Sequence, residues 1–126
     1  MNKKSYEKFG RYFEEFNIGE IIQHFPGKTI TEGESHIFSL LTMNHHPLHI
    51  DNIYARNSQF NKIIVVGTYI FSLVVGMTVR AISGKAIANL DYENINHNNP
   101  VFIGDTIRAE TEILDKKISQ SKWCRC

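Results

Sequence analysis

Cysteine is nearly absent from this sequence: Cys124 and Cys126 are the only two, and Arg125 alone separates them. They are poorly placed to bridge each other, and no other cysteine is present to pair with either. We therefore interpret them as unpaired thiols in a reducing compartment and predict a cytoplasmic protein. The start of the chain, "MNKKSYEKFGRYFEEF", also lacks the apolar stretch of a signal peptide.

Charge of one sign is not in excess either. Lys and Arg number 14, Asp and Glu number 13, and the formal net charge is +1. The sequence therefore has no basic field that would predict nucleic acid as a partner, and no acidic tail for a basic one. A length of 126 residues fits a single domain spanning residues 1–126. So small a domain would gain stability by forming oligomers.

Charged residues are missing altogether from Ile63 to Val79, between Lys62 and Arg80. A transmembrane helix needs roughly 20 apolar residues, so this run is marginal in length. It is also diluted by small and polar residues: Gly67, Thr68, Tyr69, Ser72, Gly76 and Thr78. We predict no membrane contact and expect instead a helix from about Thr68 to Ser83, ended by Gly84 and buried on every face.

Strand and helix signals surround this helix. "GEIIQHF" and "KTIT" predict two short strands separated by a Pro26-Gly27 turn. Thr31 and Glu34 form a capping box for a helix through "SHIFSLL", and Asp51 is placed to cap a helix through "NIYARNSQF". "AIANLDYENI" and "DTIRAETEIL" predict two further strands, the second with a clear alternation of apolar and polar residues.

These elements fit an α+β architecture in which a curved antiparallel β-sheet wraps around one long central apolar helix. The sheet supplies the walls that such a helix needs. That arrangement is the hot-dog fold.

The segment "TMNHHPLHID", Thr42 to Asp51, contains three histidines just before a predicted helix. A metal site built from His45, His46 and His49 is disfavoured, because Pro47 breaks the helix that would place two ligands one turn apart. No Cys, Asp or Glu lies among them, so we predict no metal. His45 and His46 are interpreted mainly as solvent-facing or hydrogen-bonding loop residues. His24, His36 and His97 have no motif around them.

Several blocks occur in the order found in one family. "GKTITEGESHIFSLLT", "NHHPLHIDNIYA", "VVGTYIFSLVVG" and "NPVFIGDTIRAETEIL" together span most of Phe9 to Leu114. The sequence resembles the MaoC-like dehydratases, which include the (R)-specific enoyl-CoA hydratases. The segments "TMNHHPLH" and "IANLDYEN" are similar to those of members acting on short branched or dicarboxylic acyl-CoAs, such as the mesaconyl-CoA hydratase type.

The resemblance implies roles for individual residues. His49 matches the family histidine that activates water, and Asn44 matches its aspartate partner, which is a departure because an amide cannot exchange a proton. Gly67 matches the glycine whose N–H binds the thioester oxygen. Pro47 fixes the loop, His46 stands where the family has asparagine, and these two with Thr68 are predicted to contact substrate.

The implied function is a hydro-lyase that adds water across, or removes it to form, the double bond of a short-chain, branched or dicarboxylic enoyl-CoA, with no cofactor. Two alternatives remain open: a non-catalytic acyl-CoA-binding protein and an acyl-CoA thioesterase of the same fold. A family member would continue beyond "DKKISQSK" into one or two more strands, whereas this sequence gives "WCRC". We therefore expect a hot-dog domain that lacks its last strands and forms a homodimer or higher oligomer.

Overall fold

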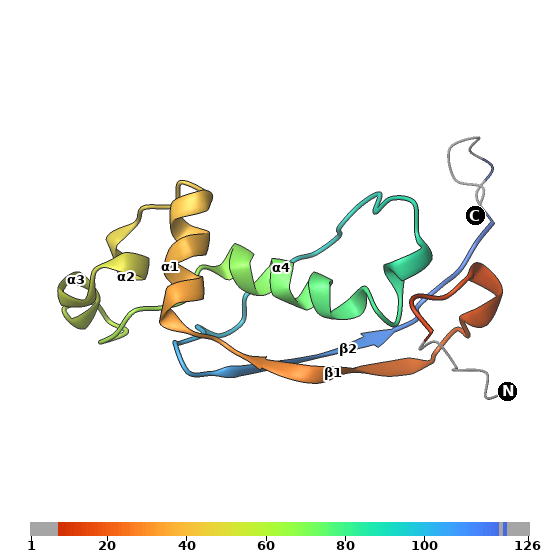
Figure 1. Cartoon of the computed structure of the whole chain (residues 1–126), viewed down its shortest axis with the longest axis horizontal. Helices are drawn as coiled ribbons and strands as arrows, with labels where there is room; N and C mark the ends of the chain where they lie inside the picture. Colours follow the sequence, from red (N-terminus) through yellow and green to blue (C-terminus); the bar gives the residue numbers. More distant parts are fainter. Residues whose placement is uncertain (1–7, 119, 121–126) are drawn as a thin grey trace, which may run out of the picture. The chain divides into compact units, whose positions relative to one another are not determined.

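The computed structural model describes residues 8–118 and 120, and the chain divides into two compact units. The first unit contains the described parts of Met1–Phe25, Gly76–Asp91 and Ala109–Cys126. The second contains Pro26–Val75 and Tyr92–Arg108. The two strands and the longest helix, all labelled in Figure 1, each contribute residues to both units.

The first unit joins the beginning of the chain to segments much later in the sequence. The N–H of Gly10 donates to the carbonyl of Arg80 at 2.7 Å, and the N–H of Gly19 donates to that of Ile113 at 2.7 Å. Gly10 has a φ of +72°, and a Cβ there would lie 2.4 Å from the backbone nitrogen of Lys85. Only glycine meets both conditions without strain, so Gly10 permits this close approach. Short 3-10 helices, η1 (Phe13–Glu15) and η2 (Ser83–Lys85), also belong to this unit.

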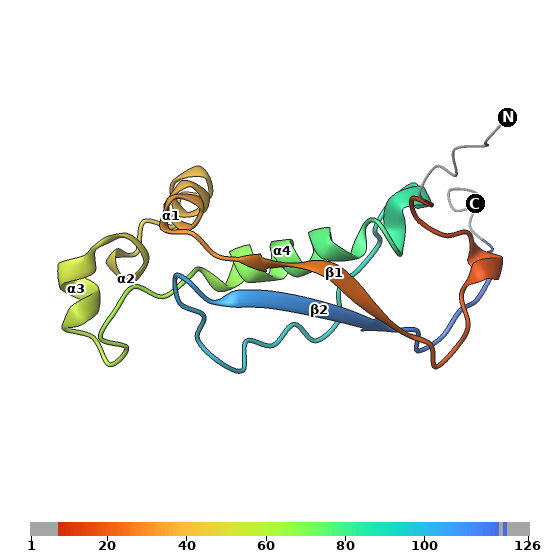
Figure 2. The same cartoon turned by 60° about the horizontal axis from the view of Figure 1, so that its bottom comes forward.

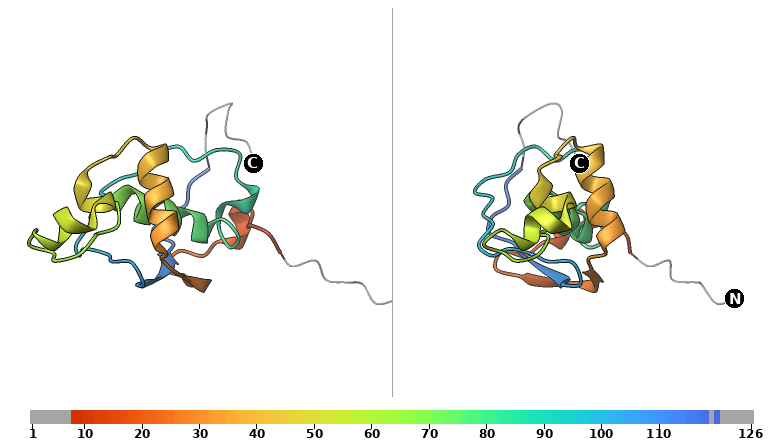
Figure 3. Two further views of the ribbon diagram at one scale, coloured as in Figure 1. Left: turned by 60° about the vertical axis from the view of Figure 1, so that its left-hand side comes forward. Right: turned by 90° about the vertical axis from the view of Figure 1, so that its left-hand side faces the viewer.

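The second unit holds most of the helices. α1 (Glu32–Leu41), α2 (Pro47–Ile50) and α3 (Asn52–Arg56) follow one another near the N-terminal end of α4 (Gly67–Thr78), as Figures 1 and 3 show. The apolar side chains buried in this unit come from the residue just before the N-cap of α1, from α3 and from the segment that leads into α4: Ile30, Ala55, Ile63, Val65 and Val66. Ile64, which lies between the buried Ile63 and Val65, is hydrogen-bonded to Leu48 and His49.

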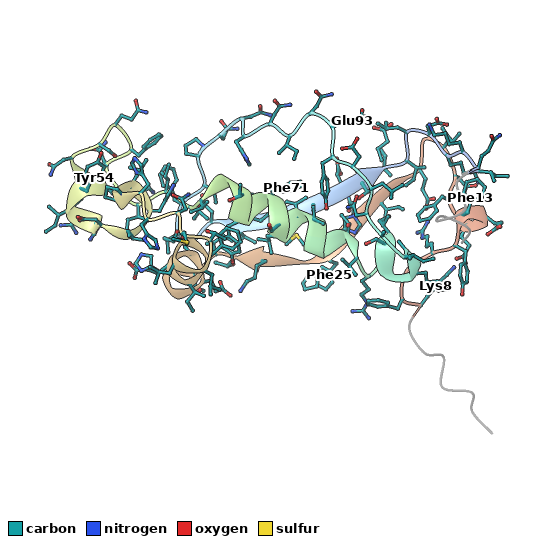
Figure 4. All side chains as sticks on the ribbon, turned by 90° about the horizontal axis from the view of Figure 1, so that it is seen from above. Lys8, Phe13, Phe25, Tyr54, Phe71 and Glu93 are labelled. Atoms are coloured by element: carbon teal, nitrogen blue, oxygen red, sulfur yellow. The ribbon has the colours of Figure 1, made fainter. Side chains whose placement is uncertain are left out.

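The sheet pairs β1 (Ile21–Thr29) with β2 (Thr106–Glu112), which lie side by side in Figures 1 and 2. The prediction of two short strands separated by a Pro26-Gly27 turn is wrong, because β1 continues through both residues. Proline is tolerated in an edge strand, where its missing N–H costs no ladder hydrogen bond. Phe25, just before it, is 90% exposed, and Figure 4 shows its side chain pointing away from the strand.

Gly27 allows the two strands to come close together. A Cβ on Gly27 would lie 3.1 Å from both the carbonyl oxygen of Ile107 and the Cγ of Arg108. β2 itself is confirmed as predicted: Ile107, Ala109 and Thr111 are half-buried, while the alternate residues are exposed. This alternation gives one sheet face that packs and one that meets solvent.

α4 begins at Gly67 but ends at Thr78, before the predicted end at Ser83. After Thr78 the chain changes to tighter turns, with the N–H of Ala81 donating to the carbonyl of Thr78 at 3.2 Å, and Gly84 lies inside η2. No residue of α4 is buried, so the expectation of a helix buried on every face is wrong. Among the described residues, no helix is long and apolar enough to cross a membrane.

The strand predicted for "AIANLDYENI", residues 86–95, does not form, and residues 86–98 adopt neither helix nor strand. Asn94 has a φ of +50°, a left-handed conformation that interrupts an extended backbone. Tyr92 instead contacts Phe71 of α4 edge to face, with the ring centroids 4.8 Å apart. The segment is therefore held by a side-chain contact to α4, and Phe71 is labelled in Figure 4.

Candidate active site

The two ends of α1 determine the path by which the chain reaches the site. Thr31 and Glu34 form the predicted capping box at its start, which confirms this part of the sequence analysis. At its end the hydroxyl of Thr42 donates to the carbonyl of Phe38 at 2.7 Å. Met43 then takes a left-handed φ of +59°, and the N–H of Asn44 donates to the carbonyl of Ser39 at 2.9 Å. These bonds fix where the chain leaves α1 and so position Asn44.

His46 and Pro47 start α2. The Nδ1 of His46 accepts a hydrogen bond from the N–H of Leu48 at 3.1 Å, so His46 is the N-cap of this single turn. Pro47 occupies the first helical position, where its missing N–H costs nothing. The Oδ1 of Asn44 accepts a weak bond from the N–H of His46 at 3.4 Å. The loop interpretation of His46 as a hydrogen-bonding residue agrees with this geometry.

The ring of His49 is held by the backbone. Its Nδ1 lies 2.9 Å from the carbonyl oxygen of Ile64. A carbonyl can only accept, so Nδ1 carries the hydrogen and donates it. The N–H of Ile64 in turn donates to the carbonyl of Leu48 at 3.4 Å, so Ile64 bonds to α2 in both directions. The neutral ring therefore presents a free lone pair on Nε2, which is the form a general base requires.

α3 completes the support of this segment. The Oδ1 of Asp51 accepts from the N–H groups of Ile53 and Tyr54 at 2.9 and 3.0 Å, which confirms Asp51 as a helix cap. Tyr54, labelled in Figure 4, presents its ring to His46 at a centroid distance of 6.0 Å and nearly at right angles. The helix is shorter than predicted, because it ends at Arg56.

Gly67 begins α4, as expected, and the ring of His97 lies against it. A Cβ on Gly67 would lie 3.0 Å from Nε2 and 3.1 Å from Cδ2 and Cε1 of His97. The glycine therefore leaves room for the imidazole, and the edge of that ring faces the start of the helix. Thr68 is exposed in the first turn.

α1 and the first turn of α4 are joined by stacked rings. Phe38 and Tyr69 lie with their centroids 5.1 Å apart. Burial raises the pKa of Tyr69 above its ordinary value, and the Glu34 carboxylate raises it further. Glu34 is ion-paired with Lys28, whose ammonium group is the main cause that lowers the pKa of Glu34 to about 2. The phenol of Tyr69 is thus neutral at physiological pH, and the start of α4 is tied to α1 by an uncharged contact.

The structure brings some of the predicted residues together. The rings of His46 and His49 have centroids 6.0 Å apart, and Asn44 bonds to the backbone of His46. His49 is linked to Gly67 through Ile64, which lies three residues before the glycine. Within residues 8–118 and 120, no group of three or more His, Cys, Asp and Glu side chains is arranged to hold a metal ion.

Sequence reasoning missed two contributions to this region. The carbonyl of Ile64 carries no side-chain signal, because any residue would supply it. No motif surrounds His97 in the sequence, yet its ring occupies the space that Gly67 leaves. Its position depends on an irregular segment remote in sequence from α4, and no local pattern predicts such a contact.

Comparison with known proteins identifies the family. The model of the MaoC like domain matches residues 14–124, so the chain belongs to the MaoC-like dehydratase family. A mesaconyl-CoA hydratase from Cereibacter sphaeroides is 37% identical over 108 residues, which cover 86% of this chain and 32% of that protein. The chain spans about a third of the length of the first curated relatives that it matches.

Solved structures give the same fold. The monoamine oxidase regulatory protein of Archaeoglobus superposes with a TM-score of 0.76 at 32% identity, covering 88% of this chain and 76% of that one. The (R)-hydratase of Aeromonas caviae superposes with a TM-score of 0.69 at 28% identity, covering 79% and 73%. The predicted α+β hot-dog fold is thereby confirmed, and the family resemblance with it.

Proposed function

We propose that this domain is the catalytic unit of a hydro-lyase that interconverts an enoyl-CoA and its 3-hydroxyacyl-CoA. The observation that carries the proposal is the ring of His49, whose Nδ1 donates to the carbonyl of Ile64 and whose Nε2 is left to accept a proton. Membership of the MaoC-like family supports the reaction class. The relative named mesaconyl-CoA hydratase supports a branched, dicarboxylic acyl group as the preferred substrate.

Hydration of an unsaturated thioester needs a base for water, a proton for C2 and a donor for the thioester oxygen. In our proposal Nε2 of His49 removes a proton from water as the water oxygen bonds to C3. The electron pair of the C2=C3 bond moves toward the thioester, which becomes enolate-like. The imidazolium of His49 then returns a proton to C2, so the sum is one water added and the ring is regenerated.

Asn44 and Gly67 have supporting roles in this proposal. The amide of Asn44 cannot exchange a proton, so it orients the water while His49 performs both transfers. The N–H of Gly67 lies at the positive end of a twelve-residue helix and donates to the developing enolate oxygen. His46, Pro47 and Thr68 are proposed to line the approach of the acyl group.

The decisive experiment is incubation of the purified protein with crotonyl-CoA and with mesaconyl-CoA. Loss of the enoyl-thioester absorbance with formation of the hydroxyacyl product supports the hydro-lyase. Release of free thiol would instead identify a thioesterase. Thermal protection by both thioesters without any turnover would identify an acyl-CoA-binding protein, which the amide at Asn44 makes the main alternative.

Assembly and location are proposed together with this activity. We propose a homodimer or higher homo-oligomer, because α4 is apolar yet has no buried residue in the described chain. Sedimentation combined with thermal unfolding at several protein concentrations tests this, since the unfolding midpoint of an oligomer rises with concentration. A folded monomer with a constant midpoint would contradict it. A cytoplasmic location and a single domain over residues 1–126 stay predictions.

A further inference from the structure

His46 and His49 are hydrogen-bonded in opposite senses. The Nδ1 of His49 donates to a carbonyl, whereas the Nδ1 of His46 accepts from the N–H of Leu48 at 3.1 Å. An accepting nitrogen must be unprotonated, so neutral His46 carries its hydrogen on Nε2. When His46 gains a proton, both of its nitrogens become donors and the bond from Leu48 is lost.

This bond has unusual importance because α2 is so short. The helix comprises only Pro47–Ile50, and His49 is one of its four residues. A single turn has almost no stability of its own and depends on the groups that satisfy its free N–H groups. The acceptor at its start therefore contributes directly to the position of the His49 ring.

We propose that His46 is an N-cap that positions His49, so that a proton on His46 removes the bond from Leu48, loosens α2 and lowers activity. The inference rests on the proposed function, because it gives His49 the role of the base. His46 acts here through the helix and is a positioning residue.

The groups that face His46 come from α2 and α3. The ring of His49 on α2 and the phenol ring of Tyr54 on α3 both lie 6.0 Å from it. Asp51 is the carboxylate nearest in sequence, and its Oδ1 already accepts two bonds from α3. A proton on His46 would therefore place a positive charge beside the imidazole of His49 and the ring of Tyr54.

The kinetic test compares the acid side of the pH–rate profile in the parent and three variants, each scaled to its own plateau. His46→Asn retains an acceptor that does not titrate, His46→Ala has no acceptor, and His45→Asn is the matched control at the exposed neighbouring histidine. Losing a helix cap corresponds to a population change of about fivefold. We expect the parent and His45→Asn to fall about fivefold further at acid pH than His46→Asn.

Two results of this assay would overturn the inference. One is an acid limb of the same depth in His46→Asn and in the parent. The other is a pH profile of His46→Ala that still shows the extra acid fall, since that variant has no cap left to lose. We expect the rate of His46→Ala to have a lower plateau and to lack the extra fall at acid pH.

A second measurement separates this inference from the proposed function. Nitrogen NMR of ¹⁵N-labelled protein reports which ring nitrogen carries the hydrogen, and amide exchange reports the bond from Leu48. We expect Nδ1 to be unprotonated in His46 and protonated in His49, and exchange at Leu48 to accelerate with the midpoint of the His46 titration. An exchange rate at the Leu48 amide that does not change when His46 gains a proton would contradict the inference even if the enzyme is active. If the protein hydrates no enoyl-CoA, the proposed function is wrong. The NMR measurement would then still test His46 as the N-cap.

Discussion

His49 and His24 place the same side chain in two different environments. His49 belongs to the second unit, is half-buried, and uses one nitrogen to bond to a backbone carbonyl. His24 belongs to the first unit, is only 8% exposed on β1, and pairs its Nε2 with the hydroxyl of Thr111 at 2.7 Å. One imidazole is held in place with a nitrogen available for chemistry, and the other is part of the packing. Changes at His49 should therefore affect activity, and changes at His24 should affect stability.

The largest effect is expected at His49. Replacing it with alanine removes the proposed base, and general acid–base groups typically contribute about 10²–10⁴-fold to rate. We expect His49→Ala to lose that much hydratase activity while the thermal midpoint changes little, because the ring is not part of the buried core. Steady-state assays on crotonyl-CoA measure the loss of activity, and a thermal melt measures the midpoint. A folded variant that works at the parent rate would show that His49 takes no part in the reaction.

The second-largest effect is expected at Gly67. Gly67→Ala would place a methyl group 3.0–3.1 Å from the ring of His97, where a ligand is proposed to approach the backbone N–H. We expect a loss of turnover of about 10-fold or more, since removing a whole oxyanion donor costs about 10²–10³. The exposed His97 ring can move aside, so the thermal midpoint should fall only slightly.

The double variant Gly67→Ala with His97→Ala separates two causes for that loss. If the methyl group acts by blocking the substrate, activity stays low when the imidazole is removed. If it acts only by displacing His97, the double variant will match His97→Ala alone. Turnover of the parent, both single variants and the double variant completes the cycle.

A smaller change is expected at Asn44. A carboxylate at this position can still accept the bond from the N–H of His46, and unlike the amide it can exchange a proton. We expect Asn44→Asp to raise turnover of crotonyl-CoA, measured against Asn44→Ala as the control without a polar group. A fall with mesaconyl-CoA but not with crotonyl-CoA would indicate that the amide is adapted to the larger acyl group. Unchanged rates with both would remove Asn44 from the site.

The comparison also shows which features could be predicted from sequence. Helix N-caps and strand alternation depend on neighbouring residues, so the capping box at Thr31, the cap at Asp51 and the alternation of β2 were predicted correctly. Pairing over long distances failed: β1 runs through Pro26 because an edge strand tolerates it, and residues 88–98 form no strand. The family and its fold were predicted because the motif blocks keep their order. The tautomers of His46 and His49 needed coordinates, since they depend on the backbone groups of Leu48 and Ile64.

The smallest effect concerns the stability of the first unit at acid pH. Burial lowers the pKa of His24 below its ordinary value of 6.5, so the folded chain favours the neutral ring. Above pH 6.5 the ring is neutral whether the chain is folded or unfolded, and its contribution to stability is complete. As the pH falls below 6.5, the unfolded chain binds the proton first, so stability decreases until the folded pKa is passed.

His24→Gln tests this sign, because glutamine can bond to Thr111 but does not titrate. We expect the thermal midpoint of the parent to fall more steeply between pH 7 and pH 5 than that of the variant. The two proteins differ only at residue 24, so the difference in slope isolates His24. Hydratase activity at pH 7.5, relative to folded protein, should match the parent, in contrast to His49→Ala. Equal slopes would mean that His24 is charged as easily in the folded chain as in the unfolded one, and that its burial on β1 does not hold the ring neutral.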